Sequence, residues 1–337
     1  MSPDLLVSIV IPTYNRVAQL ERAIAALTEQ TTDFDQFEVI VVSDGCTDGT
    51  DAYLASTEVP FRLVPAAQDN GGPAAARNRG VSLARGQFVL FIDDDVIASP
   101  QLIAEHMRTH AHSDGDLVVI GPMLTPLDFR LPPWVAWEQE MLYKQYESMK
   151  SGAYSPTYRQ FFTGNASLRR DTLIQTGGFD ASFRRAEDVE LSYRLASHGT
   201  RFVFNPDAVA YHYAERSFGS WLGTAEAYGR NDVIFGRGLG RDPELQAARR
   251  DFSSRNIMIK WAARACVGRP SLQAVLQGGL RAIATASAWL RARRVTRAAL
   301  SGVYNLAYYC AMADELGGRA PFTRLFGRRR YRPSPPF

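Results

Sequence analysis

Cysteine is scarce in this chain of 337 residues, which also has no long uncharged apolar run. The three cysteines (Cys46, Cys266 and Cys310) are an odd number without metal-site spacing, so we expect a reducing, cytoplasmic setting rather than a disulfide scaffold. No stretch approaches the roughly 18 uncharged apolar residues of a membrane span. The N-terminus has no basic region before its short apolar run, so no signal peptide is predicted.

Two nucleotide-binding signatures are missing as well. No G-x-G-x-x-G follows a strand pattern and no G-x-x-x-x-G-K-[ST] occurs, so the sequence does not support a dinucleotide site or a P-loop. With 46% hydrophobic and 22% charged residues, the composition is that of an ordinary soluble protein with a sizeable core.

Acidic residues are few in the last third of the chain. Residues 218–337 hold 20 Lys/Arg against seven Asp/Glu, a net charge of +13, and residues 1–217 therefore carry −10. Two segments of opposite sign suggest two functional surfaces, and we expect a domain boundary after residue 217. The basic segment could meet phosphates, nucleic acid or an anionic membrane, or pack on the acidic half. No motif supports nucleic-acid recognition.

Short apolar runs alternate with helical patterns through the acidic part. Strands are predicted at residues 5–11, 37–42, 61–64, 88–92, 117–120 and 201–204. A helix face is predicted at Leu20, Ala23, Ile24 and Leu27, and Pro73 opens another helix. The alternation predicts an α/β fold with a mostly parallel sheet covered on both faces, in which ligands bind beyond the carboxyl ends of the strands.

Three consecutive carboxylates, Asp93, Asp94 and Asp95, follow the buried strand at 88–92. Three adjacent anions repel one another and cost stability unless a positive charge lies between them. A divalent metal with oxygen ligands would suit them, and a bound diphosphate could share the ion. The alternative is a solvated acidic turn that opens a helix at Ser99-Pro100.

A second acidic cluster begins a predicted helix. Asp188 lies three residues before Leu191 and seven before Leu195, on the apolar stripe of that helix. Burial should raise its pKa, which makes it a general-base candidate. The alternative is a first-turn acid that favours the helix dipole. Glu190 and Arg194 should form a structural i, i+4 pair.

Histidines and aromatic residues give weaker signals. His212 ends an apolar run, and its neutral imidazole could complete a metal shell. His106 and His110 are expected on a surface helix without a role. The aromatic residues of 127–160 could form an acceptor wall, but burial tendencies favour a core role.

Six segments together resemble the inverting glycosyltransferases of family 2, which have the GT-A fold. The resemblance covers residues 4–215 and is carried by 7–16 (VSIVIPTYNR), 41–50 (VVSDGCTDGT), 72–80 (GPAAARNRG), 91–95 (FIDDD), 163–167 (TGNAS) and Glu187-Asp188. Each segment is weak alone, but their order and spacing are specific.

The resemblance implies a role for each matching position. Asp188 matches the catalytic base and Glu187 its acidic partner, while Asp95 and His212 match the ligands of Mn²⁺ or Mg²⁺. The positions that match the nucleotide and donor-sugar pocket are Pro12, Thr13, Tyr14, Asp44, Arg77, Asp93, Asp94 and Gly164. Asp44 is expected to face the base and Asp94 the ribose.

The implied function is metal-dependent, inverting transfer of a hexosyl or related group. The donor would be a nucleoside-diphosphate sugar of the UDP or dTDP type, and the acceptor a glycan, lipid-linked, peptide or small-molecule hydroxyl. The alternative is a non-catalytic nucleotide- or carbohydrate-binding partner in glycan assembly. Residues 218–337 lie outside the resemblance and read as basic helices, which could contact the inner face of a membrane or pack on the catalytic domain.

Overall fold

The computed structural model describes residues 5–113, 115–183, 186–238 and 243–327, and the chain divides into two compact units. The first unit comprises Met1–Arg130 and Glu138–Glu215, and the second comprises Leu131–Trp137 and Arg216–Phe337. The division after residue 215 is close to the boundary predicted after 217. The grouping of 131–137 with the second unit was not expected from the sequence.

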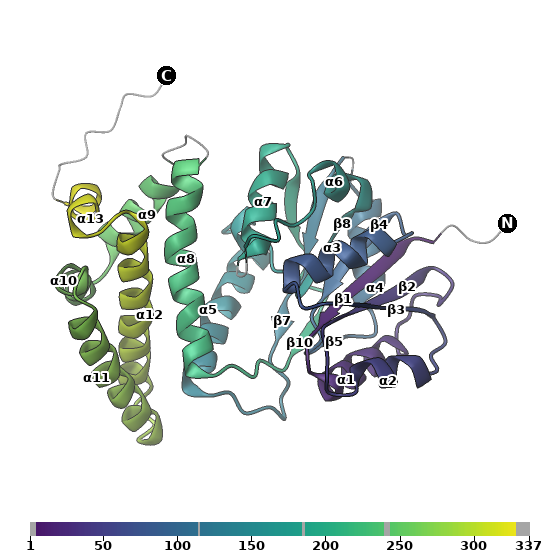
Figure 1. The fold of residues 1–337 in the computed structure, drawn as a ribbon, viewed down its shortest axis with the longest axis horizontal. Coiled ribbons are helices and arrows are strands. Elements are labelled where there is room, and N and C mark those ends of the chain that lie inside the picture. The colour runs from purple at the N-terminus through teal and green to yellow at the C-terminus, as the bar shows by residue number, and fades with distance from the viewer. Residues whose placement is uncertain (1–4, 114, 184–185, 239–242, 328–337) are drawn as a thin grey trace. The chain divides into compact units, whose positions relative to one another are not determined.

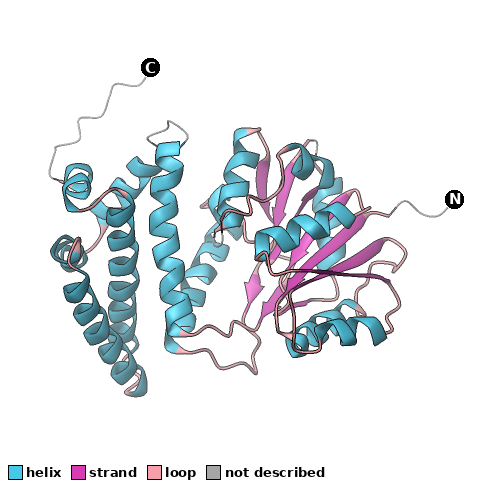
Figure 2. Cartoon of the chain, in the orientation of Figure 1, coloured by secondary structure: helices cyan, strands magenta, loops and turns pink. Residues whose placement is uncertain are grey.

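A seven-stranded sheet forms the centre of the first unit as described (Figure 2). Its strand order is β3-β2-β1-β4-β8-β6-β9. The strands are β1 (Val7–Thr13), β2 (Phe37–Asp44), β3 (Arg62–Gln68), β4 (Phe88–Ile92), β6 (Leu117–Ile120), β8 (Asn165–Arg169) and β9 (Arg201–Phe204). Pairing within this described sheet is parallel except where β8 meets β4 and β6. The predicted mostly parallel sheet is confirmed.

Helices cover both faces of this sheet (Figure 1). Successive side chains of a strand point to opposite faces, so Ile9 and Ile11 of β1 join one core and Val10 the other. The first face is covered by α1 (Val17–Leu27), α2 (Thr50–Ser56) and α4 (Leu102–Ala111), and the second by α3 (Pro73–Leu83), α6 (Arg170–Gln175) and α7 (Glu187–Ser197). The apolar face predicted for the first helix is confirmed, because its four residues are the buried residues of α1.

A small three-stranded sheet lies in the same unit, in the order β5-β10-β7. It consists of β5 (Val96–Ala98), β7 (Met123–Leu124) and β10 (Ala210–His212), and the chain between β7 and β8 forms α5 (Pro133–Lys150) and the 3-10 helix η1 (Tyr158–Gln160). The helix start at Ser99-Pro100, part of the alternative interpretation of the triplet, is two residues too early. Strand β5 follows the acidic triplet, and α4 begins only at Leu102.

The second unit is helical where the structure describes it, as predicted for the C-terminal extension. It contains α8 (Phe218–Gly238), α9 (Pro243–Ser254), α10 (Ile257–Cys266), α11 (Pro270–Trp289), α12 (Arg293–Glu315) and α13 (Arg319–Phe326). Helices α8 and α12 pack closely at Gly229, where an added Cβ would lie 2.2 Å from the carbonyl oxygen of Tyr308. Trp134 and Trp137 pack with buried Trp221 in this unit, which supports the core interpretation of these aromatic residues.

Candidate active site

The acidic triplet leaves the carboxyl end of β4, next to the end of β1. Thr13, the last residue of β1, donates a hydrogen bond from Oγ1 to Asp94 Oδ2 at 2.8 Å. Burial raises the pKa of Asp94 to about 6, and the neighbouring Asp95 charge adds to this, while Arg16 opposes it. The parallel pairing of β1 and β4 thus brings two predicted donor-site residues together.

Two arginines supply the positive charge that the triplet requires. Arg16 Nη1 lies 3.2 Å from Asp94 Oδ1 and 3.0 Å from Asp95 Oδ2. Arg77 Nη2 lies 2.8 Å from Asp93 Oδ1. Our candidate residues did not include Arg16. Its place in the loop after the strand that neighbours β4 is the signal that could have identified it.

Arg77 also joins the triplet to the second acidic cluster. Its Nη1 lies 2.7 Å from Glu187 Oε1, and the Arg77 side chain is 6% exposed. Its Nε is buried without a hydrogen-bond partner among the described residues. Residues 77, 93 and 187 therefore form one ion-pair chain, which is buried at Arg77 and Glu187 and 36% exposed at Asp93. In this structure Arg77 ties two acidic motifs together, and its predicted contact with a nucleoside stays a prediction.

Asp188 is the second residue of helix α7 and follows Glu187 of the ion-pair chain. Burial raises the pKa of Asp188 to about 7, the Glu187 charge adds to the effect, and Arg77 opposes it. The predicted rise in pKa is confirmed. Ala186, the residue just before α7, has a strained backbone, because its φ of 58° lies in the left-handed region that L-residues with a Cβ seldom adopt. The expected Glu190–Arg194 pair forms, with Arg194 Nε 2.6 Å from Glu190 Oε1.

The small sheet brings His212 to the triplet. Antiparallel pairing of β10 with β5 sets His212 opposite Val96, and the Tyr213 N–H donates to the Asp95 carbonyl at 3.1 Å. His212 Nε2 consequently lies 3.3 Å from Asp95 Oδ1. Two residues predicted as metal ligands, far apart in sequence, are neighbours.

The donor set of these neighbours fits Mn²⁺ or Mg²⁺. The carboxylate oxygen suits either ion, whereas the imidazole nitrogen is a transition-metal ligand and favours Mn²⁺ over Mg²⁺. Mg²⁺ is commonly held by one or two carboxylates, with substrate phosphates and water completing its shell. Within the described ranges, no group of three or more His, Cys, Asp or Glu side chains converges as a metal site. Asp95 and His212 would thus be a partial shell that a diphosphate completes.

Gly164 reaches the triplet because β8 runs antiparallel to its neighbours. Asn165 is paired with Ile92, so the chain enters β8 where β4 ends. A Cβ added to Gly164 would lie 3.1 Å from Asp93 Oδ2 and 2.6 Å from Met123 Sδ. A larger residue would displace one of these side chains.

Asp44 is buried and accepts hydrogen bonds from the end of β3 and the loop that follows it. Its Oδ1 accepts from Gln68 Nε2 at 2.7 Å and from the Gly71 N–H at 2.8 Å, and its Oδ2 accepts from the Gly72 N–H at 2.8 Å. The carboxylate therefore orders the glycine loop before α3. Its predicted contact with a base stays a prediction, as does that of Tyr14, which is 52% exposed at the end of β1.

A buried polar network beneath the sheet was missed in the sequence. Asn165 Nδ2 donates to the carbonyls of Pro122 (3.1 Å) and Ala208 (2.8 Å), so its Oδ1 faces His106 Nε2 at 2.8 Å. Since that oxygen can only accept, His106 Nε2 carries the proton. The network fixes the start of β8 and the chain before β10, which carries His212.

Ser167 continues this network to a second histidine. Its Oγ lies 2.8 Å from both His106 Nδ1 and His110 Nε2. Burial lowers the pKa of His106 to about 4 and that of His110 to about 3. The expectation that these two histidines lie on the surface is wrong, because both are buried and bond to polar residues of β8. The sequence of α4 alone does not show that β8 supplies such partners.

Comparison with known proteins identifies the chain. The family model described as Glycosyl transferase family 2 matches residues 8–187, more than half of the sequence. The chain belongs to this family. Validoxylamine A glucosyltransferase of Streptomyces hygroscopicus subsp. jinggangensis is 36% identical over 220 residues, which are 58% of this chain and 52% of the relative. The chain thus spans about half the length of this curated relative.

Two solved structures share the fold. The mannosyltransferase PcManGT from Pyrobaculum calidifontis, in complex with GDP-Man and Mn²⁺, has a TM-score of 0.60 at 20% identity, covering 88% of this chain and 85% of its own. S. aureus TarS 1–349, in complex with UDP-GlcNAc, has a TM-score of 0.53 at 18% identity, covering 91% and 90%. The central sheet of the family 2 member described here is therefore of the expected GT-A type.

Proposed function

We propose that the chain catalyses inverting transfer of a sugar from a nucleoside-diphosphate sugar to an acceptor hydroxyl. Asp188 takes the proton from the acceptor hydroxyl as the hydroxyl oxygen bonds to the anomeric carbon. The bond from that carbon to the diphosphate breaks on the opposite face, and the electron pair leaves with the nucleoside diphosphate. An α-linked donor gives a β-linked product.

The ion-pair chain of Asp93, Arg77 and Glu187 is the observation that carries this proposal. The 2.8 Å and 2.7 Å contacts of Arg77 hold the end of β4 against the start of α7. Carboxylates that could serve the donor and a base with a pKa of about 7 consequently share one site. A base is most effective with a pKa near the working pH.

Asp95 and His212 are the residues that would hold Mn²⁺ or Mg²⁺. The bound ion would supply positive charge that offsets the developing charge of the departing diphosphate. Arg16, between Asp94 and Asp95, orients both carboxylates. The complex of the fold neighbour PcManGT with GDP-Man and Mn²⁺ supports a divalent ion here.

The donor is proposed to be of the UDP or dTDP type. Asp44 and Tyr14 would contact the base, with Thr13 and Asp94 near the ribose. The UDP-GlcNAc complex of TarS supports a uridine donor, whereas that of PcManGT contains a guanosine donor. A calorimetric panel of UDP, dTDP and GDP with and without Mn²⁺ or Mg²⁺ tests this choice, with Asp95→Ala as the variant that should lose metal-dependent binding.

The alternative function is a non-catalytic binding partner in glycan assembly. Release of nucleoside diphosphate from donor and acceptor distinguishes it from a transferase. Metal-dependent binding without release in any acceptor mixture would favour the binder, and absence of nucleotide binding would overturn the proposed donor site.

The proposed partners are the nucleotide sugar and an acceptor of glycan, lipid-linked, peptide or small-molecule type. Peripheral contact with the inner face of a membrane through the basic C-terminal helices belongs to the same proposal. No nucleic-acid partner is proposed.

A further inference from the structure

Helix α11 carries an uncharged apolar stripe on its exposed side. Its members recur every three or four residues, which places them on one helix face. They are Val275, Gly279, Ala282, Ala286 and Trp289, all exposed. The stripe is about 21 Å long at 1.5 Å per residue. Val275 is 71% and Trp289 84% exposed, so large apolar side chains lie in solvent at both ends.

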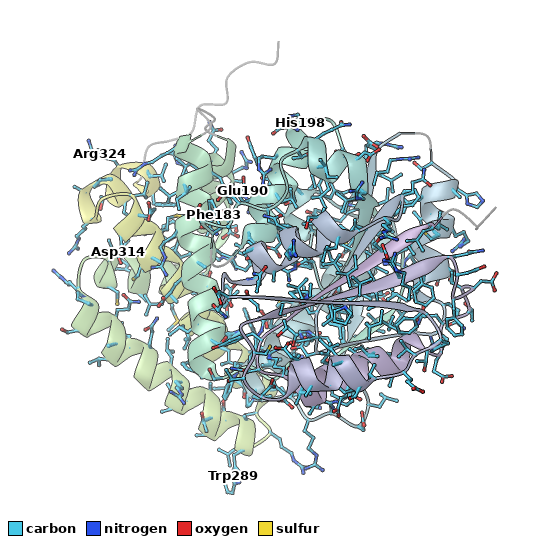
Figure 3. The ribbon with its side chains drawn as sticks, turned by 45° about the vertical axis from the view of Figure 1, so that its right-hand side comes forward. Phe183, Glu190, His198, Trp289, Asp314 and Arg324 are labelled. Carbon is cyan, nitrogen blue, oxygen red and sulfur yellow. The ribbon has the colours of Figure 1, made fainter. Side chains whose placement is uncertain are left out.

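The turn between α11 and α12 extends the stripe. Leu290 follows Trp289 and is 67% exposed, and Val295 in the first turn of α12 is 49% exposed. In Figure 3, Trp289 lies at the end of this helical hairpin and points away from the ribbon. Exposed tryptophan and leucine at a tip cost hydration free energy unless a partner covers them.

The charges around the stripe have one sign. Residues 252–313 contain nine Lys/Arg and no Asp/Glu. The exposed arginines at and near the tip are Arg281, Arg291, Arg293, Arg294 and Arg297. Arg281 also lies over the Phe218 ring, 4.3 Å from its centroid. Exposed arginines therefore flank the apolar tip in the sequence, and residues 252–313 contain no acid to balance them.

This combination matches one kind of partner, an anionic bilayer surface. A second copy docked symmetrically on the same face would set arginines against arginines. A polyanion alone would leave the apolar stripe in water. A helix with an apolar face, tryptophan and flanking arginines suits the interface between lipid headgroups and acyl chains. None of the helices in the described ranges is long and apolar enough to cross a membrane.

We propose that the outer face of α11 and the α11–α12 tip bind an anionic membrane surface, with Trp289 and Leu290 inserted and Arg293 and Arg294 on the headgroups. The inference deepens the partner part of the proposed function. It does not depend on the chemistry at Asp188. The contact holds the chain at a lipid surface, where lipid-linked acceptors are concentrated.

Co-sedimentation of the full chain with vesicles tests the inference. The vesicles are phosphatidylcholine alone or equal parts phosphatidylcholine and phosphatidylglycerol. Binding is expected only to the anionic vesicles and should weaken with salt. The tip variants are Trp289→Ser with Leu290→Ser, and Arg293→Glu with Arg294→Glu. The matched charge control is Arg79→Glu with Arg85→Glu, two exposed arginines of the first unit.

Each tip variant should bind anionic vesicles roughly tenfold or more weakly, while the control should keep most of the parent's binding. Equal loss in the control, or unchanged binding of the tip variants, would overturn the assignment. So would a dimer, seen by ultracentrifugation, that the tip variants dissolve. Calorimetric nucleotide binding, measured in parallel, should be unchanged in the tip variants. Its absence in the parent would refute the donor site and leave the vesicle result standing.

Discussion

The two units of this chain use charge in opposite ways. In the first, the carboxylates at the end of β4 and the start of α7 are wholly or partly buried, and Arg16 and Arg77 form ion pairs with them at 2.7–3.2 Å. In the second, residues 252–313 carry nine basic residues and no acid, and the arginines at the hairpin tip are exposed. A buried ion pair fixes the positions of its side chains, and removing one partner strongly destabilises the fold. Exposed charge of one sign contributes little to folding and instead selects a large anionic partner.

Among variants that test this difference between the two units, the largest effect is expected at the proposed base. Asp188→Asn should reduce the transfer rate by roughly 10²–10⁴-fold, the usual contribution of general-base catalysis, and leave the Kd for donor nucleotide nearly unchanged. Asp171→Asn is the control, since that carboxylate is 83% exposed. Rates of nucleoside diphosphate release measure both. Full turnover by the Asp188 variant would remove the base assignment.

Removing the central guanidinium should damage the fold. Arg77→Ala leaves Glu187 and Asp93 without their counter-charge, and breaking a buried pair in this way costs about 3–5 kcal/mol. Arg79→Ala on the same helix, where the side chain is exposed, should cost less than about 0.5 kcal/mol. Urea unfolding monitored by circular dichroism compares them. Similar losses in the two variants would show that the ion-pair chain is not structural.

The histidine network should give an intermediate effect. His106→Phe keeps a ring of similar shape but leaves Asn165 Oδ1 without its partner, at about 1–3 kcal/mol, and removes one of the two histidine contacts of Ser167 Oγ. His112→Phe, at the exposed end of α4, is the control. Thermal unfolding measures the difference. An unchanged Tm for His106→Phe would contradict the network.

Acid should also unfold the parent through this network. Folding lowers the pKa of His106 from 6.5 to about 4, so the unfolded chain takes up the proton first. The contribution to stability is complete above pH 6.5 and is lost as the pH falls toward 4. His106→Phe should flatten that part of the stability profile.

The pH profile of activity should reflect Asp188. Only the carboxylate accepts a proton, so kcat/KM should rise about tenfold per pH unit up to about pH 7 and then level off. The folded pKa lies above the ordinary 3.8, so the contribution of Asp188 to stability is complete below that value and is lost as the pH rises toward 7. Asp188→Asn should remove this loss. A flat kcat/KM profile between pH 5 and 8 would place the base elsewhere.

The smallest effect is expected in the second unit. Arg293→Ala with Arg294→Ala removes two exposed charges, so the free energy of unfolding should change by less than about 0.5 kcal/mol. The difference in free energy of unfolding between this variant and Arg77→Ala compares exposed with buried arginines directly. A large loss of stability here would mean that these arginines hold the helices together.

Apolar patterns predicted six of the seven strands of the large sheet in the described ranges, but not β8 or the strands of the small sheet. The strand at 88–92 and the face of α1 follow from apolar patterns that depend only on local sequence. The need for a cation near Asp94 was also visible, but its supply by Arg16 depends on β1 lying beside β4. The His212–Asp95 contact depends on a three-residue ladder between β5 and β10. Such short strands carry almost no signal of their own.

The reversed direction of β8 has a consequence for the connection that precedes it. The chain leaves the sheet at Ile120 of β6 and returns at Asn165 of β8, and hydrogen-bonded ladders hold both points. Lengthening a loop between fixed ends costs little entropy. Changes of length in this connection can therefore be tolerated outside β7 and α5, while the ladders hold the ends of β4, β6 and β8 in place.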